Sequence, residues 1–226
     1  MKKIAKILAV SALGVLAACS NPGANQNNDT AQSQPQEQNA KAVDFPDVDI
    51  KEINDYLNEI ELAGIQNFEP GKLNDEAMID FAINYLWDNS SNLFTASEEC
   101  CDRYISEKEV EKVTLKFFDT KPSKHQTIDE FTVYENGQYK IPAADGEGIS
   151  FCHVEKLIGK KGSTAEYALK FYSAGSGFNG DLDPATWGSP DEEDVPSYYA
   201  DGKATLVYKN GKYYLSGWQK TPKNDD

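Results

Sequence analysis

The sequence is poor in basic residues and in long apolar segments. It has 22 lysines and arginines against 37 aspartates and glutamates, which gives a formal net charge of −15. Nucleic-acid-binding surfaces need a basic footprint, so this balance argues against a nucleic-acid partner. It also argues against a domain that lies flat on anionic lipid. The apolar run from Ile4 to Val15 is shorter than the ~20 residues of a membrane-spanning helix, and no later run could span a bilayer.

Motifs for catalysis and cofactor binding are also missing. The chain has no Ser-centred elbow, no Gly-rich phosphate loop, no paired-His metal motif and no dinucleotide fingerprint. It has two histidines, and His125 stands beside Ser123 and Lys124 in a polar segment, where we expect it to be exposed. His153 alternates with Phe151 on a predicted strand and is the candidate catalytic base. A base needs a hydrogen-bonding partner and a shifted pKa, and the sequence supplies neither. We therefore expect no cofactor.

The first nineteen residues have a distinctive order. Met1–Lys3 is a basic start, Ile4–Val15 is apolar, and Leu16–Cys19 reads Leu-Ala-Ala-Cys. This order resembles a bacterial lipoprotein signal peptide with its lipobox. The resemblance implies that residues 1–18 are removed and that the sulfur of Cys19 carries a diacylglycerol, which two or more acyl chains such as palmitate would hold stably in a membrane. The alternative is an ordinary secretory signal cleaved after Ala18.

The resemblance also predicts where the protein resides. A lipid on Cys19 would anchor the chain to a membrane of the cell envelope, outside the cytoplasm, and Ser20 permits export to the outer membrane in a Gram-negative cell. Residues 19–44 comprise this cysteine and a segment rich in Asn, Gln, Ser, Ala and Pro. Such a segment cannot bury enough apolar surface to fold. We therefore expect a tether that spans about 25–30 Å.

Three cysteines follow the predicted anchor. An extracytoplasmic compartment permits disulfides, and we expect Cys152 to pair with Cys100 or Cys101. Adjacent Cys100 and Cys101 would need a strained ring to pair with each other. Two alternatives stay open, namely three reduced thiols or a metal site that combines these sulfurs with His153, although the spacing matches no zinc pattern.

The remaining chain, residues 45–221, is expected to form a single α+β domain, followed by a tail at 222–226. Three amphipathic segments predict helices, with Asp49 and Asn74 as N-caps of the first two and a capping box at Ser106 and Glu109 for the third. Three hairpins are then expected, around Asn136-Gly137, Gly159–Gly162 and Asn210-Gly211. Helices followed by a meander predict N-terminal helices packed on one antiparallel sheet.

This order of elements resembles the NTF2-like, or cystatin-like, superfold, in which leading helices pack into the hollow of a curved antiparallel sheet. The resemblance rests on element order over residues 49–220. A long insert at residues 173–201 departs from a compact member of that fold. The resemblance implies that His153 could face the hollow.

The insert is acidic and aromatic. Asp181 and Asp183 could present oxygens to a calcium ion from one turn, although no EF-hand pattern is in register. The alternative is a solvated acidic loop. Trp187, which lies in the same insert, is the candidate for contact with a partner because aromatic rings in loops often bind other molecules.

The function expected from these features is non-enzymatic. An acidic, tethered envelope domain without a catalytic motif suits the binding of a small ligand or of another envelope protein. The first alternative is an NTF2-like enzyme with a base in a pocket. The second is a solute-binding lipoprotein, although such binders usually have two α/β lobes.

Overall fold

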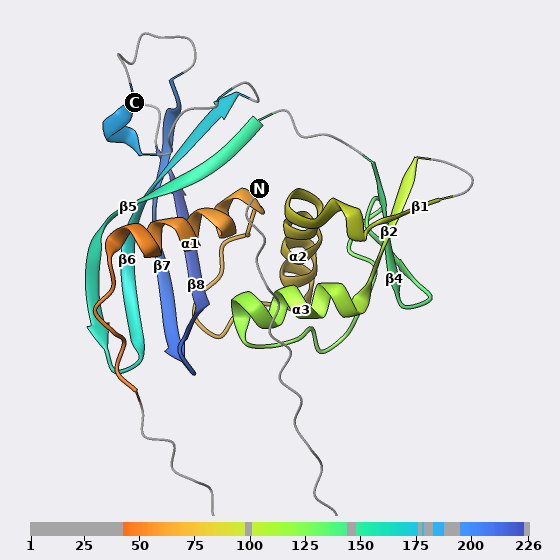
Figure 1. The fold of residues 1–226 in the computed structure, drawn as a ribbon, viewed down its shortest axis with the longest axis horizontal. Coiled ribbons are helices and arrows are strands. Elements are labelled where there is room, and N and C mark those ends of the chain that lie inside the picture. The colour runs from red at the N-terminus through yellow and green to blue at the C-terminus, as the bar shows by residue number, and fades with distance from the viewer. Residues whose placement is uncertain are drawn as a thin grey trace, which may run out of the picture. The chain divides into compact units, whose positions relative to one another are not determined.

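A computed structural model describes residues 43–97, 101–143, 148–175, 178, 183–187 and 195–223, all within one unit, Lys41–Asp226. Cys19, Cys100 and Asp181 lie outside the described residues, as does almost all of the predicted tether. The described residues form an α+β structure with three α-helices and two four-stranded antiparallel sheets (Figure 1). None of these helices is long and apolar enough to cross a membrane.

The three helices begin where their capping residues predict. They are α1 (Ile50–Leu62), α2 (Asp75–Ser90) and α3 (Glu107–Phe118). The side chains of Asp49, Asn74 and Ser106 each accept a hydrogen bond from a backbone N–H of the first turn, which confirms all three N-caps. The capping box at α3 is only half formed, because the carboxylate of Glu109 contacts Lys112 at 2.5 Å.

The strands divide into two sheets. The short sheet contains, in spatial order, β1 (Thr95–Ala96), β2 (Asp102–Ser106), β4 (Gln138–Pro142) and β3 (Val133–Glu135). The long sheet contains β5 (Gly148–Lys161), β6 (Thr164–Gly175), β7 (Ser197–Lys209) and β8 (Lys212–Pro222), in chain order. Two 3₁₀ turns, η1 (Ser91–Leu93) and η2 (Pro184–Thr186), complete the described elements.

The prediction of a single sheet was therefore wrong. The hairpin at Asn136-Gly137 forms as expected, with φ of 51° and 77° at these residues, but it belongs to the short sheet. There β4 pairs with β2, a strand before α3 that the sequence did not reveal. The second hairpin also differs, because β5 continues through Lys161 and the chain reverses at Gly162 and Ser163. The insert is shorter than expected, since β6 ends at Gly175 and β7 begins at Ser197.

The helix α1 covers the open edge of β5. The side-chain oxygen of Asn58 accepts a hydrogen bond from Cys152 N at 2.8 Å. One turn earlier, the side-chain oxygen of Asn54 accepts one from Val154 N, also at 2.8 Å. The helix therefore satisfies strand N–H groups that a neighbouring strand would otherwise bind.

The chain before α1 continues along the same edge. Phe45 N donates to Gly162 O at 2.8 Å, and the Asp47 carboxylate lies 2.6 Å from Lys160 Nζ. Register shifts between Val154 and Lys156 and beyond Leu157 mark bulges, which bend β5 as it passes α1 (Figure 1). Residues 45–58 thus follow β5 for most of its length.

The core joins α1, α2 and α3 to the long sheet. Trp218 of β8 is fully buried, and its ring meets Phe171 of β6 edge-on, with centroids 5.5 Å apart. Phe117 of α3 meets Phe81 of α2 at 5.2 Å in the same way. Backbone hydrogen bonds of 2.8 and 2.9 Å between Phe68 and Trp218 cover β8, the other edge of the long sheet.

We expect Asn58→Ala to lower the free energy of unfolding by about 1–3 kcal/mol, because the buried Cys152 N–H loses its acceptor. Asn58 is 5% exposed. Asn84→Ala, at an exposed position of α2, is the matched control and should change stability by less than about 0.5 kcal/mol. Urea denaturation of both variants measures the difference, and equal effects would show that the Asn58 hydrogen bond contributes nothing.

Candidate functional site

A groove of about 570 Å³ lies beside the covered edge of β5. We call it the α1 groove. It is lined by Ile50, Lys51, Asn54, Asp55, Asn58, Glu59, Leu62, His153, Val154 and Asp183. The outer side of α1 forms one wall of the groove, and β5 forms the second wall. Asp183, the residue before η2, forms the third wall. Its volume lies within the range of about 300–1,000 Å³ that is usual for ligand sites.

The α1 groove brings together two of the residues that the sequence selected separately. His153 comes from β5 and Asp183 from the insert, 30 positions apart in the chain. The Nδ1 atom of His153 is buried and has no hydrogen-bonding partner in the described part of the protein. The carboxylate of Asp183 accepts a hydrogen bond from Ala185 N at 2.9 Å and thereby caps η2. Among the described residues, no group of three or more His, Cys, Asp or Glu is arranged to hold a metal ion.

Acidic side chains dominate the charge of the α1 groove. Asp55, Glu59 and Asp183 are its carboxylates, and Lys51 is its single ammonium group. Lys51 Nζ lies 3.4 Å from Asp55, and Glu59 lies 2.8 Å from Lys116, which belongs to α3. Both ion pairs are solvent-exposed and therefore weak, so a ligand can displace them. The groove suits a partner that offers cationic groups or hydrogen-bond donors.

Beneath α1, a buried carboxylate fixes the helix to the long sheet. The side chain of Glu61 is fully buried, and its Oε1 accepts hydrogen bonds from Ser150 at 2.6 Å, Tyr199 at 3.1 Å and Lys220 at 2.7 Å. These partners come from β5, β7 and β8. Glu61 Oε2 is buried without a partner in the described residues. The Lys220 ammonium also lies 5.2 Å from the centre of the Phe171 ring. This cluster holds the C-terminal half of α1, and hence one wall of the groove, in place.

Cys152 lies close to this cluster. It is fully buried, and burial, together with the charge of Glu61, raises the pKa of its thiol well above the ordinary value. A thiol held neutral is a poor nucleophile and a poor metal ligand. In the structure, Cys152 and Cys101 are both free, and Cys101 is exposed. The predicted bridge between these two residues is therefore not formed.

Trp187 does not stand free of the domain. It is half-buried, and its ring meets Tyr172 edge-on at 4.9 Å and Phe151 at 5.7 Å. Phe178 stacks on Phe151 at 6.0 Å. The insert thus contributes its aromatic side chains to the face of the long sheet that carries Phe151, and contact of Trp187 with a partner stays a prediction.

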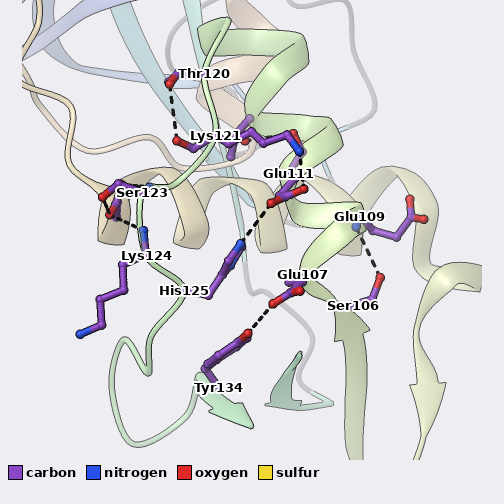
Figure 2. Close-up of polar contacts among 12 residues, drawn as sticks. Ser106, Glu107, Glu109, Glu111, Thr120, Lys121, Ser123, Lys124, His125 and Tyr134 are labelled. Carbon is purple, nitrogen blue, oxygen red and sulfur yellow. Dashed lines mark hydrogen bonds and ion pairs between the residues drawn. The ribbon is translucent and has the colours of Figure 1, made fainter. Parts of the chain in front are cut away.

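The expectation that His125 is exposed was wrong. Its side chain is 13% exposed and lies in a polar cluster between α3 and the short sheet (Figure 2). Nδ1 lies 2.7 Å from the hydroxyl of Tyr139, Nε2 lies 3.6 Å from Glu111, and the ring stacks on Tyr134 at 5.6 Å. Tyr134 in turn donates a hydrogen bond to Glu107, which raises the pKa of the phenol. Nε2 faces the Glu111 carboxylate but, like Nδ1 of His153, is buried without a hydrogen-bonding partner in the described residues. The contacts of the ring join α3 to the short sheet.

A second carboxylate holds the loop that carries His125. Asp75, at the start of α2, accepts hydrogen bonds from Ser123 N, Ser123 Oγ and Lys124 N at 2.5–3.0 Å. Burial would raise the pKa of Asp75, but these hydrogen bonds outweigh it and lower the pKa. No local sequence signal predicts this cluster, because its members lie far apart in the chain.

Comparison with known proteins does not add to this geometry. No protein-family model matches the chain. No curated protein matches it either. The function must therefore be argued from the sites themselves.

We expect Lys220→Met to destabilise the fold by about 3–5 kcal/mol, because it leaves the buried Glu61 carboxylate without a counter-ion. Lys223→Met, an exposed lysine just beyond the same strand, is the matched control and should change the free energy of unfolding by less than about 0.5 kcal/mol. Thermal and urea denaturation measure both values. A Lys220 variant as stable as the control would mean that Glu61 is not held as a charged group.

Proposed function

We propose that the protein is a lipoprotein of the cell envelope, anchored through Cys19, whose domain binds a partner at the α1 groove without catalysing a reaction. The observation that carries the binding part is the α1 groove, where three carboxylates, His153 and an exposed apolar side chain, Leu62, surround one hollow. The anchor part is carried by the Leu16–Cys19 motif.

The construction of the α1 groove supports a binding role. Two of its three walls are a helix, α1, and a strand, β5, which position side chains more precisely than loops do. Hydrogen bonds from β5 hold Asn54 and Asn58, and the Glu61 cluster holds the end of α1. The partner favoured by the acidic wall is a basic segment of another envelope protein or a small cationic ligand.

We also propose a relationship to the NTF2-like or cystatin-like superfold for part of the domain. The support is that α1 packs against four antiparallel strands in chain order, β5 to β8, with α1 before them in the sequence. The short sheet, α2 and α3 would then be an addition between α1 and β5. His153 would sit at the edge of that sheet, beside the helix.

The anchor is tested by metabolic labelling with a clickable palmitate analogue in a bacterial host. We expect the wild-type chain to incorporate the label and Cys19→Ala to lose it completely, because the lipid is attached through this sulfur. Ser20→Ala should keep the label and serves as the control. Labelling that persists in Cys19→Ala, or is absent from the wild type, would contradict the anchor.

The binding site is tested by site-specific photo-crosslinking in living cells. A photoreactive amino acid replaces Leu62 in the α1 groove or, as the control, Leu93 in η1; these side chains are 43% and 42% exposed. We expect a discrete crosslinked product from position 62 only. It should weaken several-fold when Asp55→Asn and Glu59→Gln remove two charges of the wall. Equal products at both positions, or none at position 62, would contradict the proposal.

A further inference from the structure

A second hollow, of about 550 Å³, lies between α1, α3 and the turn from β7 to β8. We call it the lysine pocket. Its charged lining residues are Lys112, Lys116 and Lys212, and none of the described carboxylates is part of the lining. Three glutamates reach it from outside: Glu109 pairs with Lys112, Glu59 pairs with Lys116, and Glu52 lies beside Tyr213. In a chain with 37 acidic and 22 basic residues, this concentration of ammonium groups runs against the overall charge. The α1 groove, which α1 also lines, has the opposite charge.

The three lysines differ in how firmly they are held. Lys116 Nζ lies 2.8 Å from Glu59 and 2.7 Å from the hydroxyl of Tyr85, and it sits over the rings of Tyr85 and Phe117. Lys112 pairs with Glu109 at the surface. Lys212 has no acidic partner among the described residues. The pocket thus holds one fixed cation and offers two more that an incoming anion can contact.

The rest of the pocket is aromatic and apolar. The rings of Tyr56 and Tyr213 lie 6.2 Å apart, and the hydroxyl of Tyr56 donates to Tyr213 O at 3.1 Å. Leu115 is 40% exposed at the rim. A ligand that suits this lining has an anionic head group attached to a less polar body.

The pocket lies where the chain from the predicted tether enters the domain. Tyr213 stacks on Phe45 with ring centroids 5.6 Å apart. Phe45 follows Cys19 by 26 positions, and a flexible segment of that length spans only about 25–30 Å. If Cys19 is lipidated, a segment of this length keeps the entry point of the chain, and the pocket beside it, within reach of the head groups of the bilayer.

We propose that the lysine pocket binds a phosphate group, supplied by the head group of an anionic phospholipid in the membrane that holds Cys19. This inference rests on the proposed anchor. Ammonium groups bind phosphate oxygens through charge-assisted hydrogen bonds. The net negative charge opposes binding in which the whole domain lies flat on anionic lipid. It does not oppose contact through one local pocket whose lysines face the head group. The acyl chains would already hold the N-terminus in the bilayer, and a local basic site would add a contact between the domain itself and the anionic head groups.

The test uses the processed chain from residue 19 onward with Cys19→Ser, so that no acyl chain contributes and the unit Lys41–Asp226 stays whole. Co-sedimentation is measured with vesicles of phosphatidylcholine alone and with equimolar phosphatidylglycerol, at about 0.1 M salt. A second arm titrates glycerol 1-phosphate and inorganic phosphate by ³¹P NMR. The pocket variant is Lys112→Gln with Lys212→Gln. The control is Lys124→Gln with Lys223→Gln, two exposed lysines that do not line the pocket and give the same change in charge.

We expect the wild type to bind the phosphatidylglycerol vesicles and glycerol 1-phosphate. The pocket variant should bind both at least about ten-fold more weakly, whereas the control pair should bind as the wild type does. Equal loss in both pairs, or no binding by the wild type, would overturn the proposal. If the wild type binds the soluble phosphates through these lysines but does not bind the vesicles, the proposal that a phospholipid supplies the phosphate group would be overturned. Because the chain is unacylated, these outcomes are independent of palmitate labelling at Cys19.

Discussion

The hydrogen bonds from β5 to the side chains of Asn54 and Asn58 are the contacts on which the arrangement of this domain depends. Four residues of an α-helix advance about 6 Å, and two residues of a strand advance about 6.6–6.8 Å. Side chains at i and i+4 of a helix can therefore meet alternate N–H groups of a strand that runs alongside it. The helix covers the edge where a fifth strand would pair, and its apolar face packs in the core. Its more exposed residues line two hollows of opposite charge.

The sequence predicted the helices better than the sheets, and the reason is the distance over which each is encoded. Asp49, Asn74 and Ser106 cap helices that begin at the next residue, so the signal is local. The hairpin turns at Asn136 and Asn210 are also local and were found. Which sheet a hairpin joins is decided elsewhere, by pairing such as that of Ile105 with Tyr139. The strand β2 has five residues and one fully buried side chain, so its pattern of apolar residues is too short to predict that pairing.

The site residues follow the same division. His153 and Asp183 could be selected one at a time as chemically capable side chains, but only the bend of β5 and the return of the insert bring them to one hollow. Glu61 was not selected, because a glutamate in an amphipathic helix is ordinarily solvated. Its burial depends on Lys220, 159 residues later in the chain. His125 was judged from its polar neighbours, whereas its environment is set by Tyr139 and Glu111.

The path of residues 45–58 along β5 has a mechanical consequence. Any pull transmitted through the segment before Phe45 acts on the Phe45–Gly162 hydrogen bond, the Asp47–Lys160 ion pair and the two asparagine contacts together. Because this segment lies alongside the strand, the load is directed along the seam and shared among its contacts. A peptide attached end-on would instead peel away one bond at a time. If the predicted tether exists, this attachment would resist tension from it in shear.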